Sequence, residues 1–587
     1  MNQHFNSNQN QNRQKQQSSS YPLKIVALGG LDEMGKNCYI IEAGDDAFII
    51  EAGMKYPSKA IPGVDTIIPD FTYVKTLGSK VKGIIITHGH DDQYGALPYL
   101  LNFCHAPVYA SRTTIAIINS TYGKKFKRQI SSATFIPVDP SGHAVIGSHN
   151  FEFFETTHSV SESFGFALKT KFGNIVYTSD YMTDYAPLKG YYFDLPKLAR
   201  LSESEKTFLL LTESEAADKT GIASPAHKIT DTLRRVLEEQ SGKVFISLYS
   251  QNFYNIQEVI NLAGKYQKKI LIANPDQVSF FDDMARSGSI VIPQDMRISA
   301  SDLIHTNSSD VIVLVTGGGE KLFKFIQDIC YGMVKDLKID TKDTFIDATP
   351  SVPGTEDIAT ITSDTVYRAD CNVIALSRKT FASMHARQED IKMMISLFHP
   401  RYYMPVKGEY RLLMANAMLA IGMGVGLNHF NTFVYDNGLA LAFDEEGKAV
   451  RKVINIKAGD IMVDGYSVGD VKENSIAERQ KMADGGVVIM GVNISSKLKK
   501  IVSQPDIQMR GFLYLKESEP ILGQLSSLFL TNVNNFLAST GKKIAIQDLE
   551  YRISEKASKL LVRHTEKEPL VVVKILDVDR MEELDPR

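Results

Sequence analysis

The chain has 587 residues, of which 43% are hydrophobic and 23% are charged. This balance is typical of a globular protein, and the length allows roughly three or four domains. The net charge of −3 excludes a protein that coats nucleic acid through a general excess of positive charge. If RNA is the substrate, a local patch or channel must bind it.

The first 20 residues consist mostly of Asn, Gln and Ser. Such a segment buries too little apolar surface to offset the entropy of ordering, so residues 1–20 are predicted to form a disordered tail. They lack the apolar core of a signal peptide, and the longest apolar runs are strand-length and too short to span a membrane.

The four cysteines lie far apart and form no Cys-x-x-Cys pair: Cys38, Cys104, Cys330 and Cys371. This spacing predicts neither a zinc ribbon nor a disulfide framework, and it favours the reducing cytosol. We therefore expect a cytoplasmic protein without membrane contact.

Apolar strands that end in polar clusters characterise the first 180 residues. Strands are expected at Leu23–Leu28, Cys38–Glu42, Asp46–Glu51, Val81–Thr87, Phe151–Thr157 and Asn174–Thr178. A helix is expected from Tyr94 onward. The fourth strand runs into His88, the fifth into His158 and the sixth into Ser179-Asp180. Strand-end loops are where open sheets bind ligands, so these clusters are candidate site residues.

Alternating strands and helices between residues 226 and 385 predict a parallel sheet surrounded by helices. Its strands are expected at Lys243–Tyr249, Lys269–Ala273, Val311–Thr316 and Asn372–Leu376. A helix at Ile391–Phe398 and a strand at Tyr402–Val406 follow. Gly459–Gly469 is rich in Gly and Asp and is interpreted as a linker. Strands at Val487–Val492 and Pro569–Leu576, with helices between them, predict a small α/β domain.

The strongest motif is Thr87-His88-Gly89-His90-Asp91-Asp92-Gln93, directly after an apolar strand. Two histidines one residue apart and a carboxylate can converge on one ion from a tight turn, and both groups are good ligands for Zn²⁺ and similar metals. The alternative is a helix-capping turn with two surface histidines. The later strand-end residues His158 and Asp180 favour the metal site.

This pattern resembles the signature of the metallo-β-lactamase superfamily. The flanking segments resemble the ribonuclease J family in particular, in one order from residue 21 to the C-terminus. They include Met34-Gly35-Lys36-Asn37, Pro62-Gly63-Val64-Asp65, Pro350-Ser351-Val352-Pro353-Gly354-Thr355-Glu356, Pro405-Val406-Lys407-Gly408-Glu409-Tyr410 and Arg510-Gly511-Phe512.

The resemblance implies an α/β architecture: a metallo-β-lactamase αββα sandwich with an inserted parallel-sheet β-CASP domain and a small α/β C-terminal domain. The sandwich would comprise residues 21–225 and 386–458, the β-CASP domain 226–385, a linker 459–481 and the C-terminal domain 482–587. The implied activity is 5′-to-3′ exonucleolytic and endonucleolytic hydrolysis of RNA in RNA processing and decay, with the strand threading between the sandwich and the β-CASP domain.

The resemblance also implies two metal positions. The first would be held by His88, His90 and His158, with Asp180 bridging to the second. Asp92 would bind the second ion with two further histidines, but this chain has Gln93 and Lys407 at those positions. An amide oxygen is a weak zinc ligand, and a protonated lysine has no lone pair to donate.

Lys407 is expected to take over part of the second ion's charge by pairing with Asp92 or Asp180. The alternative is a surface lysine that points into solvent. Two ions in such sites lie roughly 3.5–4 Å apart, so an ammonium group nearby would compete with the second one.

Other positions also depart from the family pattern. Glu51 and Thr212-Glu213 replace an Asp and a Ser-Asp, and Phe381-Ala382-Ser383-Met384-His385 retains only the second of two histidines. By resemblance, Asp92 and His385 are the expected catalytic residues, and Ser383 and His385 are expected to contact RNA. The turn Thr316-Gly317-Gly318-Gly319-Glu320 could cradle a phosphate with its amides or be a plain tight turn.

Two functions remain open. The first is a ribonuclease with weakened activity and one metal per chain, most simply zinc, with manganese or magnesium as alternatives. The second is a nearly inactive scaffold subunit that binds RNA beside an active paralogue. The expected partners are RNA and either a second copy or a paralogue. A small-molecule hydrolase is disfavoured because such relatives lack the β-CASP and C-terminal domains.

Overall fold

A computed structural model describes residues 21–58, 61–352, 354–378, 380–465, 467–469, 473–512, 515–539 and 545–579. The predicted tail at 1–20 lies outside these residues. The chain divides into two compact units, one comprising residues up to Tyr56 and Ile67–Ile461, the other Pro57–Thr66 and the chain from Met462. No helix in the described ranges is long and apolar enough to cross a membrane.

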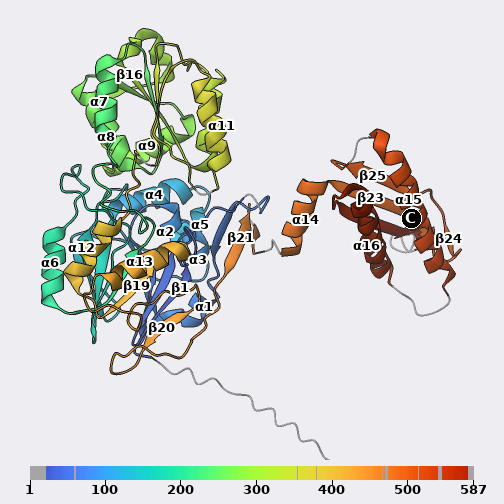
Figure 1. Cartoon of the computed structure of the whole chain (residues 1–587), viewed down its shortest axis with the longest axis horizontal. Coiled ribbons are helices and arrows are strands. Elements are labelled where there is room, and N and C mark those ends of the chain that lie inside the picture. Colours follow the sequence, from blue (N-terminus) through green and yellow to red (C-terminus); the bar gives the residue numbers. More distant parts are fainter. Residues whose placement is uncertain are drawn as a thin grey trace, which may run out of the picture. The chain divides into compact units, whose positions relative to one another are not determined.

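Two mixed sheets form the lower part of the first unit in Figure 1. The first has the order β20-β1-β2-β3-β5-β6-β7. Its strands are β1 (Leu23–Gly29), β2 (Cys38–Ala43), β3 (Asp46–Ile50), β5 (Val81–Ile86), β6 (Val108–Ala110), β7 (Phe135–Pro137) and β20 (Ala440–Phe443). The second has the order β19-β12-β11-β10-β9-β8. Its strands are β8 (His143–Ile146), β9 (His149–Glu155), β10 (Phe164–Thr170), β11 (Gly173–Tyr177), β12 (Thr207–Glu213) and β19 (Tyr402–Val406).

The two sheets pack face to face around one apolar core. Side chains of the first sheet, such as Ile41 and Phe48, meet those of the second, such as Phe166 and Leu209. The apolar residues that alternate along each strand explain this arrangement, because one face of every strand must be buried.

Helices cover the outer faces of both sheets. Strands β3, β5, β6 and β7 are parallel, and their crossover connections contain helices. The helices that accompany the first sheet are α1 (Thr72–Leu77), α2 (Asp91–Tyr94), α3 (Leu97–Leu100), α4 (Arg112–Tyr122) and α5 (Lys127–Ser132). Those packed on the second sheet are α6 (Leu195–Ser204), α12 (Gln388–Phe398) and α13 (Tyr410–Gly422). The expected αββα sandwich is confirmed.

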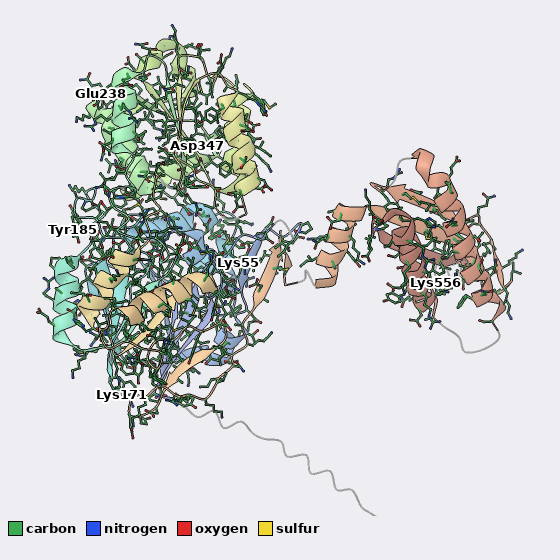
Figure 2. All side chains as sticks on the ribbon, in the orientation of Figure 1. Lys55, Lys171, Tyr185, Glu238, Asp347 and Lys556 are labelled. Atoms are coloured by element: carbon green, nitrogen blue, oxygen red, sulfur yellow. The ribbon has the colours of Figure 1, made fainter. Side chains whose placement is uncertain are left out.

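A six-stranded parallel sheet is inserted between β12 and α12, in green and yellow in Figure 1. Its order is β15-β14-β16-β13-β17-β18, with every neighbouring pair parallel. The strands are β13 (Val244–Tyr249), β14 (Lys269–Ile272), β15 (Arg297–Ile298), β16 (Val311–Gly317), β17 (Thr344–Asp347) and β18 (Asn372–Ala375). The helices are α7 (Thr230–Glu239), α8 (Phe253–Lys265), α9 (Pro275–Ser287), α10 (Gly319–Cys330) and α11 (Glu356–Tyr367). Figure 2 labels Asp347, at the end of β17, among the side chains of this domain.

The second unit contains a small α/β domain. Strand β23 (Val487–Ser495) lies between β25 (Asp506–Arg510), which is antiparallel to it, and β26 (Leu570–Asp577), which is parallel. Helices α15 (Leu515–Ala538) and α16 (Ile546–Thr565) share an apolar core with these strands. Strands β22 (Ser467–Val468) and β24 (Lys500–Ile501) and helix α14 (Glu473–Gly485) also belong to this unit, whereas the division between the units falls within β4 (Thr66–Pro69) and β21 (Asp460–Asp464).

Two local expectations need correction. The helix expected from Tyr94 begins earlier, at Asp91, and is split into α2 and α3. The helix is split because the Ala96 amide donates its hydrogen bond to Ala52 O, in the neighbouring loop, and not to a carbonyl oxygen of the preceding helical turn. The segment interpreted as a linker, Gly459–Gly469, contains the hairpin of β21 and β22, in which Val463 pairs with Val468.

A buried carboxylate, Asp184, connects the sandwich to the inserted domain. It accepts hydrogen bonds from Tyr254 Oη in α8 (3.1 Å) and Ser224 Oγ (2.9 Å), and it pairs with Lys228 (3.0 Å). Burial by itself raises the pKa of this carboxyl, but the surrounding donors, His227 first among them, hold the pKa well below its usual range.

We expect Asp184→Asn to lower the free energy of unfolding at pH 7 by about 2 kcal/mol, because charge-assisted hydrogen bonds are lost. Because the pKa of Asp184 is lower in the folded state than in the unfolded state, its ionised carboxylate stabilises the fold fully at pH values above the unfolded-state pKa of ~4. This stabilisation is lost as the pH falls from there through the folded-state pKa. The difference between wild type and variant in urea unfolding should therefore shrink below pH ~4. Asp231→Asn, at a side chain that is 89% exposed, is the control and should have little effect at any pH.

Candidate metal centre

Three histidines from two strand-end loops lie together at one edge of the sandwich. His88 and His90 follow β5, and His158 follows β9. Their ring centroids are 4.8–4.9 Å apart. His88 is 0% and His158 1% exposed, so the alternative of a capping turn with surface histidines does not fit.

The fourth member of this cluster is Asp180, which follows β11. Strands β9 and β11 both pair antiparallel with β10, so they run in the same direction and end at the same edge. Asp180 Oδ2 lies 3.3 Å from His88 Nε2 and 3.6 Å from His158 Nε2. The ligand atoms of all four residues lie within 4.8 Å of one another.

Each imidazole is oriented by a hydrogen bond at the nitrogen that faces away from the cluster. His158 Nδ1 donates to Met384 O (2.8 Å), His90 Nε2 contacts Ser159 Oγ (2.8 Å), and His88 Nδ1 contacts Thr87 Oγ1 (3.1 Å). Partners of this kind are characteristic of metal-binding histidines, because they select the tautomer that leaves the other nitrogen with a lone pair.

The inward nitrogens fit a divalent cation. His88 Nε2 is buried without a hydrogen-bond partner among the described residues. His158 Nε2 and His90 Nδ1 lie 3.2 Å apart, close to the ~3.3 Å separation of two nitrogen ligands on a tetrahedral zinc ion. With the outward nitrogens protonated, two lone pairs face each other, an arrangement that a cation stabilises. Burial, followed by the neighbouring His88, lowers the pKa of His90 to about 3, so its ring is neutral at pH 7.

Lys407 lies where the second metal ion is expected. It follows β19, is 2% exposed, and its Nζ forms an ion pair with Asp180 and another with Asp92 at 3.1 Å. The surface-lysine alternative is therefore wrong. Burial by itself lowers the pKa of an amine, but Asp180 and Asp92 hold the pKa of Lys407 well above its ordinary value. The ammonium group is permanently charged at neutral pH.

Gln93 is buried, and neither its side-chain oxygen nor its nitrogen has a hydrogen-bond partner within the described part of the chain. Both backbone groups of Gln93 form hydrogen bonds: its carbonyl oxygen accepts from the Ala52 amide, and its amide donates to His90 O. The side chain thus contributes neither a strong ligand nor a structural hydrogen bond to the second position.

His385 lies beside the histidine cluster, with its ring centroid 5.1 Å from that of His158. Its Nδ1 is 2.7 Å from Glu213 and its Nε2 is 3.3 Å from Glu215. Burial by itself lowers the pKa of this ring, but Glu215 and Glu213 raise it to about 9. His385 is therefore an imidazolium ion held between two carboxylates.

Glu51 supports the turn that carries His88. Its carboxyl group accepts from Thr87 Oγ1 (2.5 Å) and from the Thr87 amide (3.2 Å). Burial raises the pKa of Glu51 to about 8, so this group is largely protonated at pH 7.

The fold brings most of the expected site residues together: His88, His90, Asp92, Gln93, His158, Asp180, His385 and Lys407. Ser383, expected to contact RNA, is exposed. The turn at Gly317–Gly319 belongs to the inserted domain and begins α10.

One further residue lies at the site without having been singled out from the sequence: Glu215 contacts both His385 and Lys407. Gln251 lies in the inserted domain, in the segment Tyr249-Ser250-Gln251-Asn252 that resembles an RNA-facing segment of the family, and it donates to Asp91 Oδ1 (3.2 Å). The position of Glu215 two residues beyond Glu213, just after a buried strand, is the one feature that could have indicated it.

Comparison with known proteins gives three family matches. The metallo-beta-lactamase superfamily matches residues 31–227, the beta-CASP domain of ribonuclease J matches 241–365, and the C-terminal domain of ribonuclease J matches 474–578. The chain is 30% identical over 557 residues to "Ribonuclease J 2" of Staphylococcus aureus, covering 95% of this chain and 98% of that protein. "Ribonuclease J 2" of Staphylococcus epidermidis is 30% identical over 558 residues with the same coverage. A solved structure, a protein of unknown function from Enterococcus faecalis V583, aligns with a TM-score of 0.49 at 14% identity, covering 72% of this chain and 100% of that one.

Proposed function

The chain belongs to the ribonuclease J family, and from this premise we propose that it hydrolyses RNA slowly, at a centre that holds one zinc ion and one lysine ammonium group in place of two metals. The observation that carries this proposal is the buried Lys407, whose Nζ pairs with Asp180 and Asp92. These are the two carboxylates that the family pattern assigns to the second ion.

The charges at the site support a single divalent ion. Contacts of 4.0 Å or less link two cations, Lys407 and His385, with four carboxylates: Asp92, Asp180, Glu213 and Glu215. A histidine binds a metal ion through its neutral ring, so with all three clustered histidines as ligands this network has two uncompensated negative charges. One divalent ion neutralises them, whereas a second would leave an excess of positive charge in a buried site, where unpaired charge is costly.

His88, His90, His158 and Asp180 would hold the ion, which when bound supplies Lewis-acid activation of water and phosphate. His385 lies beside this cluster and, as an imidazolium, can donate a hydrogen bond to a phosphate oxygen or a proton to the departing oxygen. Asp92 can accept a proton from the attacking water, but Lys407 and Asn37 Nδ2 (3.1 Å) already bind its Oδ2. The engaged carboxylate would be a weaker base, which supports a reduced rate.

The proposal extends to both 5′-to-3′ exonucleolytic and endonucleolytic cleavage, in cytoplasmic RNA processing and decay, with manganese or magnesium as alternatives to zinc. The second candidate function is a nearly inactive subunit that binds RNA and pairs with an active paralogue. It is favoured by the same two substitutions, Gln93 and Lys407, since both remove ligands from the second position. In either case we propose a dimer, with a second copy or with the paralogue.

We expect purified protein to contain about one zinc per chain and to degrade 5′-monophosphorylated RNA slowly. Metal content is measured by mass spectrometry and RNA decay on gels. His158→Ala removes one ligand and should reduce the metal content close to zero; His305→Ala, outside the cluster, is the control. Two tightly bound ions together with rapid processive decay would contradict the proposal. Metal binding without decay would select the scaffold function.

A further inference from the structure

Glu215 is more exposed to solvent than either of the two cations that it contacts. Its side chain is 24% exposed, compared with 12% for His385 and 3% for Lys407. It follows β12 in a turn, two residues beyond the buried Glu213. Glu215 therefore lies on the solvent side of the two cations that it contacts.

The two oxygens of Glu215 engage two different cations. Oε1 lies 3.3 Å from His385 Nε2, and Oε2 lies 3.9 Å from Lys407 Nζ. The opposite nitrogen of His385 is already bound to Glu213 at 2.7 Å. Nε2 is thus the one nitrogen of this ring that could contact a substrate, and Glu215 covers it.

A phosphodiester group offers the same chemistry as this carboxylate: two neighbouring oxygens that share a negative charge. An RNA phosphate that approaches His385 would need the position that Glu215 takes, and a fixed carboxylate nearby would also repel it. No other hydrogen bond holds the Glu215 side chain within the described residues, so it can turn toward solvent without breaking further contacts.

We propose that Glu215 competes with the RNA phosphate for His385 and Lys407. The Glu215 carboxylate must move away from both cations before RNA can bind in a reactive position. This inference rests on the proposed function, because it assumes that RNA occupies this site. Glu215 therefore weakens the binding of every phosphate ligand at this position. It does not position His385, which Glu213 holds by itself.

The test compares wild type, Glu215→Gln and a matched control, Asp218→Asn, all loaded with zinc. Asp218 lies three residues further along the same segment, and its carboxylate pairs with Lys219 (3.0 Å) and Arg411 (3.6 Å) instead of the site. Both substitutions remove one negative charge. The probe is a single-stranded RNA of about ten nucleotides with phosphorothioate linkages that slow its hydrolysis, followed by fluorescence anisotropy, with inorganic phosphate as competitor.

We expect Glu215→Gln to bind the RNA roughly fivefold more tightly than wild type and to be more sensitive to inorganic phosphate, while Asp218→Asn changes the affinity less than about twofold. Equal affinity of Glu215→Gln and wild type, or an equal gain in both variants, would overturn the inference and leave the proposed function intact. Weaker binding by Glu215→Gln, with unchanged thermal unfolding, would also overturn it, since Glu215 would then position His385. Failure of all three proteins to bind RNA would contradict the proposed function and the inference with it.

Discussion

Restoring both missing ligands, Gln93→His together with Lys407→His, should convert the centre into a two-metal site. We expect the metal content to rise from about one to about two ions per chain, and the rate of RNA hydrolysis to rise about 100-fold, because a second ion stabilises the charge that develops on the attacked phosphate. The gain has two physical causes: imidazole replaces a weak amide ligand, and a buried positive charge is removed from the position of a cation.

The single variants separate these causes. Gln93→His alone should bind little additional metal, because the Lys407 ammonium group still repels the second ion. Lys407→His alone should bind the second ion weakly, since Asp92 and Asp180 are then free to ligate it. Metal content is measured after gel filtration, and rates are measured under single-turnover conditions. A double variant that binds two ions but remains as slow as wild type would show that the missing ligands are not the cause of low activity.

Lys407→Met should destabilise the protein by ~3–5 kcal/mol when no metal is added, because the pairs with Asp92 and Asp180 are lost and buried negative charges remain uncompensated. Added divalent metal should restore much of this loss, since an ion can then bind between the two carboxylates. The measurement is urea unfolding with and without excess zinc or manganese.

Lys36→Met is the matched control for this experiment. Lys36 is also 2% exposed, and its ammonium group pairs with Glu33 (3.1 Å) and Asp460, outside the histidine cluster. We expect a loss of similar size that added metal does not restore. Equal metal rescue of both variants would mean that the ion stabilises the fold generally, and that Lys407 does not occupy a metal position.

Much of the site could be predicted from the sequence because its ligands are close in sequence or lie at recognisable strand ends. His88 and His90 follow an apolar strand directly, and His158 and Asp180 follow strands whose alternation is plain. The splitting of the helix after His90 could not be predicted, since it depends on the hydrogen bond between the Ala96 amide and Ala52 O. That bond joins residues whose proximity only the folded loop creates.

The residue types alone determined the chemistry that this site can perform: three imidazoles and an aspartate suit a divalent metal, and a lysine at position 407 has no lone pair to bind one. Only the tertiary structure decided which charges face each other. It buries Lys407 between Asp180 and Asp92, and it places Glu215 against His385, 170 positions away in the sequence. The physical reason is that a Coulomb interaction depends on distance and burial, and both arise only when distant strand ends meet at one edge of the sandwich.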